Sequence, residues 1–341
     1  MATIRDVARE SGVSVATVSY VLNNGPRPVR DETRERVLAV MRRLDYHPNA
    51  MARGLVRRRL FTLGVLFSSV EPTVVTNNYA TCVLRGIMAA AVQAGYNVTI
   101  FTRPWQDARR SAARFGDRRT DGILVAAPSV GSDVVSGLAQ RGVPVVVVSA
   151  PSGDSCVPWV DVDNARGAVL ATEHLLALGH RRIAFLMGDG TQRSVFQRRD
   201  AFLATLARAG VTARDDYWLP GSFEPEVVYR NVTRLLNLPE PPTSIFTTND
   251  DMAATTLEAA RDLGVRVPQD LSVIGFDDYP YKGVGAPILT TVRHPLAEVG
   301  EAAARLLIDR VEGRGDGQRE MVFQPELIVR ETTLPPSSRL N

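Results

Sequence analysis

Short apolar runs alternate with longer amphipathic stretches along most of the chain. The runs that predict strands are Val98–Phe101, Ile123–Ala126, Val145–Val148, Ile183–Leu186 and Leu271–Phe276. The stretches that predict helices, each followed directly by a glycine, are Thr81–Ala94, Asn164–Leu178 and Asp250–Leu263. Continuous apolar strands are typical of sheets buried on both faces, and repeated β-α-β units predict parallel sheets covered by helices. At 341 residues the chain is long enough for two such sheets, with a cleft between two lobes at their strand ends.

The first 47 residues follow a different pattern, which predicts three short helices. The segment Thr3–Asp6 fits a capping box that opens a helix to about Ser11, and Gly12 can end this helix in a left-handed conformation. Ser14 can cap a second helix, and a third is expected at about Asp31–Leu44. The apolar positions expected to join these helices are Ile4, Val7, Ala8, Val15, Val18, Val21, Leu22, Val37, Leu38, Met41 and Leu44.

The turn between the first two helices is only three residues long, from Gly12 to Ser14. Two short helices on so tight a turn predict a helix-turn-helix, whose second helix presents its N-terminal residues to the DNA major groove. Ala16 and Thr17 are small enough to let the backbone approach DNA, and Tyr20 lies one turn further on the same side. A three-helix scaffold that does not bind DNA is the alternative.

Charge is divided unevenly along the chain. Residues 1–59 hold 12 arginines and 6 acidic residues, a net charge of +6, whereas the remaining 282 residues carry a net charge of −3. A basic head on a mildly acidic body is what a polyanion-binding module attached to a globular domain would show. The charge distribution therefore favours a DNA-binding head.

Membrane and secretory signals are absent from the pattern. No apolar run approaches the roughly 18 residues of a spanning helix, and the N-terminal residues MATIRDVARE lack the apolar core of a signal peptide. Cys82 and Cys156 are two thiols in a large chain, which favours two buried or free cysteines in a reducing cytoplasm. We therefore expect a cytoplasmic protein without membrane contact.

Motifs for catalysis are equally sparse, so no enzyme activity, cofactor or metal site is expected. The segment Gly188–Arg193 begins like a dinucleotide fingerprint, but Arg193 stands where its third glycine belongs. Neither a GxxxxGK(S/T) phosphate loop nor a GxSxG nucleophile elbow occurs. The histidines lie in unrelated contexts without the spacing of metal ligands: His47, His174, His180 and His294.

Two segments of the head, Thr3–Asn23 and Glu32–Leu55, resemble the DNA-binding head of the lactose/galactose repressor (LacI/GalR) family. The resemblance continues through the body in the segments Asp121–Ser129, Val160–Ala168, His174–Gly188, Asn249–Ala253, Val267–Asp278 and Leu289–Pro295. It covers about residues 2–333. The resemblance implies an α/β body of two periplasmic-binding-protein-like lobes, with parallel sheets covered by helices, and an N-terminal all-α helix-turn-helix DNA-binding domain.

The resemblance also implies how the chain is divided. The expected parts are a helix-turn-helix head at 1–47, a hinge helix and linker at 48–60, and an effector-binding and dimerisation body at 61–341. Within the body, the expected ranges are about 61–160 plus 292–322 for the N-lobe, and about 162–290 plus 323–341 for the C-lobe. Strands that cross between the lobes are expected near Val160, Leu289 and Phe323.

A set of DNA contacts is implied as well. Val15, Ala16 and Tyr20 would read bases, and Thr17 and Ser19 would lie nearer the backbone phosphates. Many relatives carry arginine or histidine where Tyr20 stands. Because tyrosine cannot make the bidentate contact to guanine that arginine makes, the outer operator bases are expected to differ. The expected DNA-contacting residues are Thr3, Ser14, Val15, Ala16, Thr17, Ser19, Tyr20, Asn23, Arg27, Asn49, Ala52, Arg53 and Leu55.

The linker between head and body holds a further short helix pattern. Pro48 cannot lie inside a helix, but Asn49 can cap a helix over Ala50–Val56. The resemblance implies a hinge helix that orders on DNA, pairs with its twin and pushes Leu55 into a central base step from the minor groove. Arg57–Arg59 can contact phosphates, with a solvated charge run as the alternative.

Seven residues are implied to line an effector pocket in the cleft: Tyr79, Ser129, Asp163, Arg198, Phe223, Asn249 and Asp277. An arginine and an aspartate can hold vicinal hydroxyls, asparagine can donate and accept, and aromatic rings can cover an apolar face. This chemistry favours a sugar, with a purine or nucleoside as the alternative. Tyr79 and Phe223 could instead be core residues, and Asp163 and Asp277 could instead cap turns or helices.

Together these features predict a sequence-specific transcriptional regulator: a repressor that binds a pseudo-palindromic operator as a homodimer and is switched by a small molecule. A secreted solute-binding protein shares the body fold, but such a protein would carry a signal peptide and would lack a basic head. The C-terminal residues TTLPPSSRLN have no leucine heptads, which favours a dimer over a tetramer built on a coiled coil.

Overall fold

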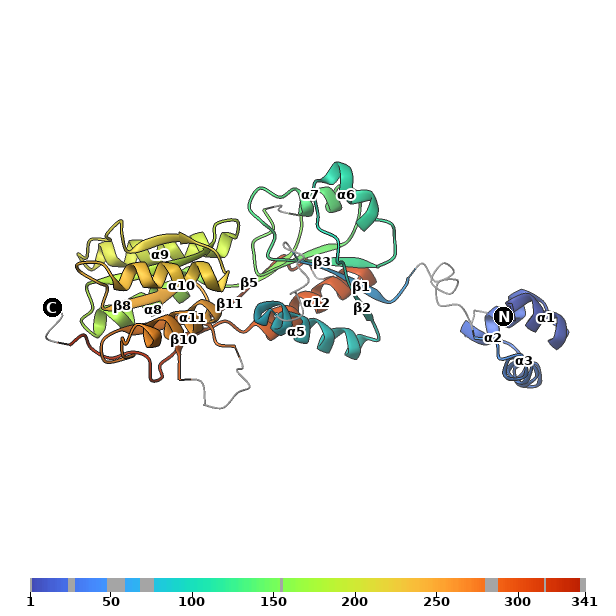
Figure 1. The fold of residues 1–341 in the computed structure, drawn as a ribbon. Helices are drawn as coiled ribbons and strands as arrows, with labels where there is room; N and C mark the ends of the chain where they lie inside the picture. The colour runs from blue at the N-terminus through green and yellow to red at the C-terminus, as the bar shows by residue number, and fades with distance from the viewer. Residues whose placement is uncertain are drawn as a thin grey trace. The chain divides into compact units, whose positions relative to one another are not determined.

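The computed structural model describes residues 2–23, 28–47, 59–67, 77–153, 156–279, 288–315 and 317–337. The chain divides into two compact units, Met1–Leu60 and Phe61–Asn341 (Figure 1). The first unit is helical where it is described, and the second consists of two α/β lobes. Within the described ranges, no helix is both long and apolar enough to cross a membrane.

The described part of the first unit contains the three helices expected from the sequence: α1 (Ile4–Ser11), α2 (Val15–Asn23) and α3 (Asp31–Arg43). The hydroxyl of Thr3 accepts from the backbone N–H of Asp6, whose carboxylate accepts from the N–H of Thr3, so the predicted capping box is confirmed. Gly12 ends α1 with a φ of 67°. Ser14 Oγ accepts from the N–H of Thr17 and caps α2 as predicted.

A small apolar core joins the three helices. Val7 and Val37 are fully buried in it. The predicted pattern is wrong at two positions, because Leu38 is 36% exposed and Val15 is 42% exposed. Leu38 lies about 100° around α3 from Val37, and Val40 takes the inward position instead. Val15 stands in the first turn of α2, which leaves its side chain on the surface.

The first lobe is built on a parallel sheet with the strand order β11-β5-β4-β3-β1-β2. Its strands are β1 (Thr62–Phe67), β2 (Asn97–Ile100), β3 (Gly122–Ala126), β4 (Val145–Val148), β5 (Trp159–Val162) and β11 (Glu320–Phe323). One face packs against α5 (Asn78–Ala94) and α12 (Leu296–Glu312), and the other against α6 (Ala108–Phe115) and α7 (Val134–Ala139). Leu124 of β3 packs in the first layer and Val125 in the second, which accounts for the continuous apolar run in the sequence.

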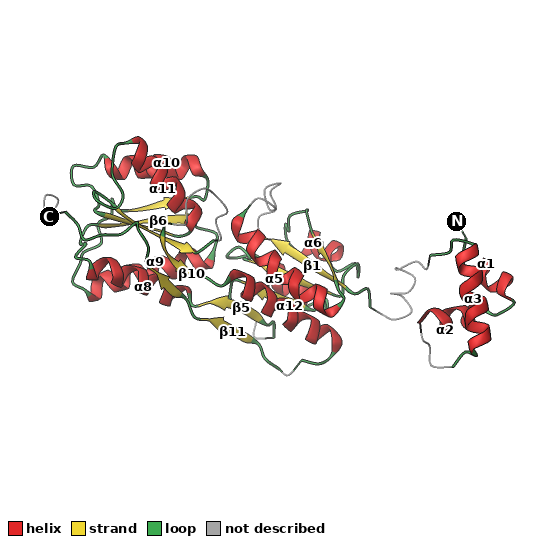
Figure 2. Ribbon diagram, turned by 90° about the horizontal axis from the view of Figure 1, so that it is seen from below, coloured by secondary structure: helices red, strands yellow, loops and turns green. Residues whose placement is uncertain are grey.

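The second lobe repeats this plan with the strand order β12-β10-β9-β8-β6-β7. Its strands are β6 (Ile183–Asp189), β7 (Trp218–Gly221), β8 (Ser244–Thr247), β9 (Ser272–Asp277), β10 (Thr290–Arg293) and β12 (Glu326–Ile328). Figure 2 shows α8 (Asn164–Ala177) on one side of this sheet and α10 (Pro225–Leu236) and α11 (Asp250–Asp262) on the other; α9 (Arg193–Arg208) packs with α8. The predicted α/β class is confirmed. The pairing in this sheet is parallel except at its edge, where the described strand β12 runs antiparallel to β10.

In the described ranges the chain passes between the lobes three times. It leaves the first sheet after β5 to begin α8, returns after β10 to form α12, which packs on α5, and crosses again between β11 and β12. The second crossing lies just after Arg293, a short way beyond the expected position near Leu289, because β10 stays paired with β9 up to Arg293. These crossings place the carboxyl ends of strands from both sheets at one cleft.

A buried histidine fixes the C-terminal segment to the second lobe. Nδ1 of His180 lies 2.9 Å from Thr243 Oγ1. Its Nε2 lies 2.9 Å from the carbonyl oxygen of Leu334 and 3.1 Å from Ser272 Oγ. Burial lowers the pKa of His180 to about 4. The imidazole is therefore neutral at neutral pH and joins three separate segments of the lobe.

The pH dependence of unfolding tests this arrangement. The pKa of His180 in the folded protein lies below its ordinary value of 6.5, so the unfolded chain takes up the proton first as the pH falls. The stability that neutral His180 contributes is therefore lost between about pH 6.5 and pH 4. We expect the His180→Gln variant to be less stable at pH 7 but to lose less stability than the parent between pH 7 and about 4.5. Urea unfolding at both pH values measures the difference. Equal losses in the two proteins would contradict the role of His180.

Candidate functional site

A cavity of about 140 Å³, here called the inner cavity, lies between the two lobes of the second unit. Strands β3, β4 and β9 end at it, with Ala127, Ser149 and Asp277 in its wall. The carboxyl ends of parallel strands are where open α/β sheets bind ligands. The other residues that line the inner cavity are Asn77, Tyr79, Asp161, Gln192, Ser194, Val195, Arg198, Phe223, Asn249, Asp251, Tyr279 and His294.

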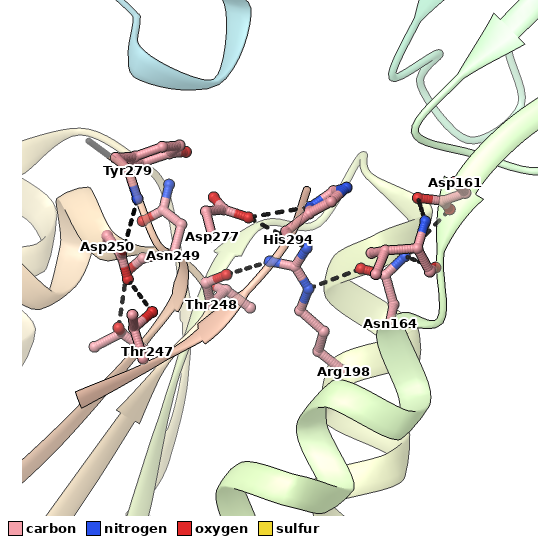
Figure 3. Close-up of polar contacts among 12 residues, drawn as sticks. Asp161, Asn164, Arg198, Thr247, Thr248, Asn249, Asp250, Asp277, Tyr279 and His294 are labelled. Atoms are coloured by element: carbon pink, nitrogen blue, oxygen red, sulfur yellow. Dashed lines mark hydrogen bonds and ion pairs between the residues drawn. The ribbon is translucent and has the colours of Figure 1, made fainter. Parts of the chain in front are cut away.

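Arg198 of α9 lies at the centre of the polar network around the inner cavity (Figure 3). Its side chain is 7% exposed; Nε donates to Asn164 Oδ1 at 2.9 Å, and Nη1 donates to the carbonyl oxygen of Thr248. Nη2 lies 3.8 Å from Asp277 Oδ1, and the guanidinium stacks 3.5 Å above the centre of the Phe276 ring. Burial lowers the pKa of Arg198, whereas Asp277 opposes this shift. Arginine stays protonated in proteins, so these contacts hold a buried positive charge.

Carboxyl groups outnumber cations around the inner cavity. Asp161, Asp251 and Asp277 line it, whereas Arg198 is the one arginine or lysine among its described lining residues. Burial raises the pKa of Asp161 and that of Asp251. A ligand that donates hydrogen bonds from hydroxyl groups would satisfy these carboxyls, whereas an anion would meet repulsion.

Asp250 supports the inner cavity from behind. Its Oδ2 accepts from the backbone N–H of Tyr279 at 3.1 Å (Figure 3). Its Oδ1 accepts from the hydroxyl of Thr291 at 2.5 Å. Burial, and then the nearby Asp277, raise the pKa of Asp250 well above its usual value. A Cβ at Gly275 would lie 2.2 Å from Asp250 Oδ1, so a glycine is required beside this carboxyl. The result is a fixed position for Tyr279 at the cavity wall.

Backbone strain is concentrated at the strand ends that form the inner cavity. Ala127, Ser149 and Asp277 have positive φ angles of 45°, 57° and 116°, which non-glycine residues rarely adopt. Each such conformation costs on the order of 1–3 kcal/mol and persists only where the surrounding structure enforces it. Three of them at one cavity indicate a site shaped for binding.

Among the described residues, His294 Nε2 is a buried atom at the inner cavity without a hydrogen-bond partner, and the buried hydroxyls of Tyr79 and Ser149 have no partner besides each other. Nδ1 of His294 lies 3.3 Å from Asp277 Oδ1 (Figure 3). This contact favours the tautomer with the proton on Nδ1, which leaves Nε2 as an acceptor. An unsatisfied buried polar group costs about 1–3 kcal/mol, so a ligand that completes these bonds gains binding energy.

Five of the seven predicted pocket residues lie together at the inner cavity: Tyr79, Arg198, Phe223, Asn249 and Asp277. The other two lie elsewhere. Asp163 caps α8, where its Oδ1 accepts from the N–H of Arg166 at 2.8 Å, and it does not line the inner cavity. Ser129 lines a neighbouring cavity.

Some of the five residues also have a structural role. Asn249 Oδ1 accepts from the N–H of Met252 at 2.9 Å as the cap of α11, which leaves its amide nitrogen as the group that can donate into the cavity. Tyr79 and Phe223 pack against core clusters as well as lining the cavity. A Cβ at Gly188 would lie 2.2 Å from the Phe223 ring, so a glycine there lets the ring approach β6.

Several residues that line the inner cavity were not predicted from the sequence, and among them Asp161, Asp251 and His294 have ionisable side chains. Asp161 lies two residues before Asp163, so the same motif holds both, and only the buried one, 2% exposed, faces the cleft. His294 directly follows β10. A polar residue within one position of the carboxyl end of a buried strand, as Asp161 is in β5 and His294 is after β10, is the signal that could have found both.

The described DNA-contact candidates gather around the start of α2. Ser14, Val15 and Ala16 are exposed there, and Ser14 Oγ lies 2.9 Å from Thr17 Oγ1. Ser19 and Tyr20 on the next turn are half-buried, and Thr3 is exposed at the start of α1. The predicted contacts that lie outside the described residues, together with the expected hinge helix, are the side chain of Asn23 and residues Arg27, Asn49, Ala52, Arg53 and Leu55.

Both units match known families. A model described as "Bacterial regulatory proteins, lacI family" matches residues 3–49, and one described as "Periplasmic binding protein-like domain" matches residues 172–333. The chain is 34% identical over 336 residues to the HTH-type transcriptional repressor PurR of Erwinia tasmaniensis, with 97% of each chain covered.

Solved structures agree with this match. The lac repressor dimer bound to operator and the anti-inducer ONPF has a TM-score of 0.85 and 26% identity, with 98% of this chain and 99% of that chain covered. The transcriptional regulator CelR in complex with cellobiose has a TM-score of 0.74 and 28% identity, with 97% of this chain and 100% of that chain covered. The chain therefore belongs to the LacI family, and it is a DNA-binding transcriptional regulator with a helix-turn-helix head and an effector-binding body.

Proposed function

We propose that this regulator is a repressor that binds a pseudo-palindromic operator as a homodimer and is switched by a carbohydrate in the inner cavity. The observation that carries the proposal is the polar lining of that cavity, with carboxyl groups in excess around Arg198 and with Phe223 beside them. Carboxyls accept hydrogen bonds from sugar hydroxyls, and a buried guanidinium donates to ring and hydroxyl oxygens. The face of Phe223 can cover the apolar side of a sugar ring.

Two relatives support the choice of a carbohydrate. CelR was solved in complex with cellobiose. A LacI family regulator from Enterococcus faecium was solved with bound ribose; it has a TM-score of 0.71 and 26% identity, with 81% of this chain and 100% of that chain covered. A purine or nucleoside is the competing class of effector.

For the DNA we propose base contacts by Val15, Ala16 and Tyr20 and phosphate contacts by Thr17 and Ser19. The exposed start of α2 supports these roles, because the second helix of a helix-turn-helix contacts base edges with its N-terminal residues. The roles implied for Thr3, Ser14, Asn23, Arg27, Asn49, Ala52, Arg53 and Leu55 belong to the same proposal. The net charge of +6 on residues 1–59 is consistent with contacts to many phosphates.

The homodimer is supported by the outer face of α5. Met88 is 54% exposed and Val92 is 75% exposed on this helix, an unusual exposure for large apolar side chains on one face. A second copy of the chain, related by a twofold axis, would bury both residues in an interface that pairs this face with itself. The lac repressor was likewise solved as a dimer bound to operator.

Contacts between the lobes explain how a ligand can act as a switch. Asn78 Nδ2 of α5 donates to Asp251 Oδ1 of α11 at 2.7 Å. Asp251 also lines the inner cavity, so a ligand that engages this carboxyl competes with a bond that joins the lobes. Loss of this bond can change the arrangement of the lobes. If the ligand binds the DNA-bound and DNA-free forms of the protein with unequal affinity, its binding changes the affinity for DNA by linkage.

The test begins with selection of sites from random DNA by the full-length protein at a fixed salt concentration. Operator affinity is then measured with and without glucose, galactose, ribose, cellobiose, adenine, hypoxanthine and guanosine. We expect a pseudo-palindromic motif, and a change of about 5- to 150-fold in operator affinity with at least one of the sugars. A response to a purine alone would overturn the carbohydrate assignment. The absence of any enriched motif would overturn the base contacts proposed for α2.

A further inference from the structure

A second and larger cavity, here called the outer cavity, adjoins the inner one and has a volume of about 550 Å³. Its walls come from the segments 128–132 and 150–153, from Val135 and Ser136, and from Arg193. The residues next to these in the sequence, Ala127, Ser149 and Gln192, line the inner cavity. Because the two linings are adjacent at three separate places in the chain, the cavities are neighbouring compartments of one cleft.

A short main-chain bridge marks the boundary between the compartments. Ser129, which lines the outer cavity, pairs as an isolated antiparallel bridge with Gln192, which lines the inner one. The N–H of Val130 donates to the carbonyl oxygen of Thr191 at 2.7 Å beside it. Since these residues belong to different lobes, a ligand that spans both compartments touches the segments that hold the lobes together.

The outer cavity differs from the inner one in chemistry. The described residues that line it carry hydroxyls and one guanidinium, with no carboxyl group and no aromatic ring; the polar ones are Ser129, Ser132, Ser136, Ser152 and Arg193. Hydroxyls both donate and accept, and a guanidinium donates from several nitrogens. This set suits a second hydroxylated ring, held by hydrogen bonds rather than by stacking.

Size also distinguishes the two compartments. Ligand pockets usually measure roughly 300–1,000 Å³. The inner cavity, at about 140 Å³, falls below that range and has room for one small ring, whereas the outer cavity, at about 550 Å³, falls within it. A ligand confined to the inner cavity would leave most of the volume of the cleft unused.

We propose that the effector is an oligosaccharide of at least two units, with one unit in the inner cavity and the next in the outer cavity, where Ser132 and Arg193 hydrogen-bond it. This inference rests on the proposed carbohydrate function and narrows its substrate class. The outer cavity is then the compartment that distinguishes an oligosaccharide from its own monosaccharide.

The test compares matched sugars on the full-length protein by isothermal titration calorimetry. The pairs are glucose with cellobiose, xylose with xylobiose, and galactose with β-1,4-galactobiose. We expect at least one disaccharide to bind about tenfold more tightly than its monosaccharide, the effect of two or three added hydrogen bonds. Equal affinities within every pair that binds would overturn this inference while leaving the carbohydrate function intact. If none of the six sugars bound, both this inference and the carbohydrate proposal would fail.

Two variants test whether the preference for the disaccharide arises in the outer cavity. Ser132→Trp fills the compartment from an exposed position, and Arg193→Ala removes its guanidinium. Both should reduce the preference for the disaccharide to less than about threefold and leave the affinity for the monosaccharide unchanged, because only the second unit loses hydrogen bonds. Gln140→Trp, on an exposed residue at the end of α7, is the matched control and should keep the full preference. An undiminished preference in both cavity variants would overturn the placement of the second unit.

Discussion

Replacement of Arg198 by methionine is expected to weaken effector binding by about 10- to 100-fold, the size of a lost charge-assisted hydrogen bond, and to make operator binding insensitive to effector. The guanidinium lines the inner cavity and lies 3.8 Å from Asp277 Oδ1. Its loss leaves Asp277 buried without its cationic partner. Breaking a buried ion pair in this way costs about 3–5 kcal/mol, so the variant should also unfold at a lower urea concentration. Calorimetry with the sugar that the parent binds, and urea unfolding, measure the two effects.

A second variant separates binding from stability. In Arg198→Met combined with Asp277→Asn, no uncompensated charge remains at the pair, so most of the lost stability should return. Effector binding should stay weak, because both groups line the inner cavity. If Arg198→Met bound the effector as tightly as the parent, the guanidinium would not contact the ligand, and the assignment of the inner cavity would be wrong. Recovery of binding in the double variant would show that Arg198 acts only through the fold.

Local chemistry explains which parts of the fold were predictable. The ends of α1 depend on Thr3, Asp6 and Gly12, which act within a few residues of one another, and the prediction was confirmed there. Buried strands such as β3 are visible as apolar runs because helices cover both faces of their sheet. The direction of β12 was not predictable in this way. Its antiparallel pairing with β10 depends on where the chain returns from the other lobe.

In the candidate site, too, some residues could be predicted from local sequence, whereas others depend on the path of the chain. Asn249 and Asp277 each stand in a segment that resembles the family, and both line the inner cavity, as does Arg198. Asp161 and Asp163 lie in one motif. Only the three-dimensional path of β5 decides that Asp161 faces the cleft and that Asp163 caps α8. The role of His294 could not be predicted either, because its partner Asp277 lies on a different strand. Its contact with Asp277 forms only when β10 pairs with β9.

Replacement of Tyr20 by arginine is expected to change the operator rather than to abolish binding. Tyr20 lies half-buried on α2, one turn beyond the exposed residues Val15 and Ala16. A tyrosine offers a ring edge to a thymine methyl group and one hydroxyl, whereas arginine makes a bidentate contact to guanine that contributes about 1–3 kcal/mol of discrimination. Site selection from random DNA should therefore show a roughly ten- to hundredfold shift towards guanine at one position in each half-site.

Ala39→Arg, which adds the same charge at an exposed position of α3, is the control. Because added charge alone strengthens binding to all sequences, its motif should match that of the parent. An identical motif from all three proteins would remove Tyr20 from the base-reading residues.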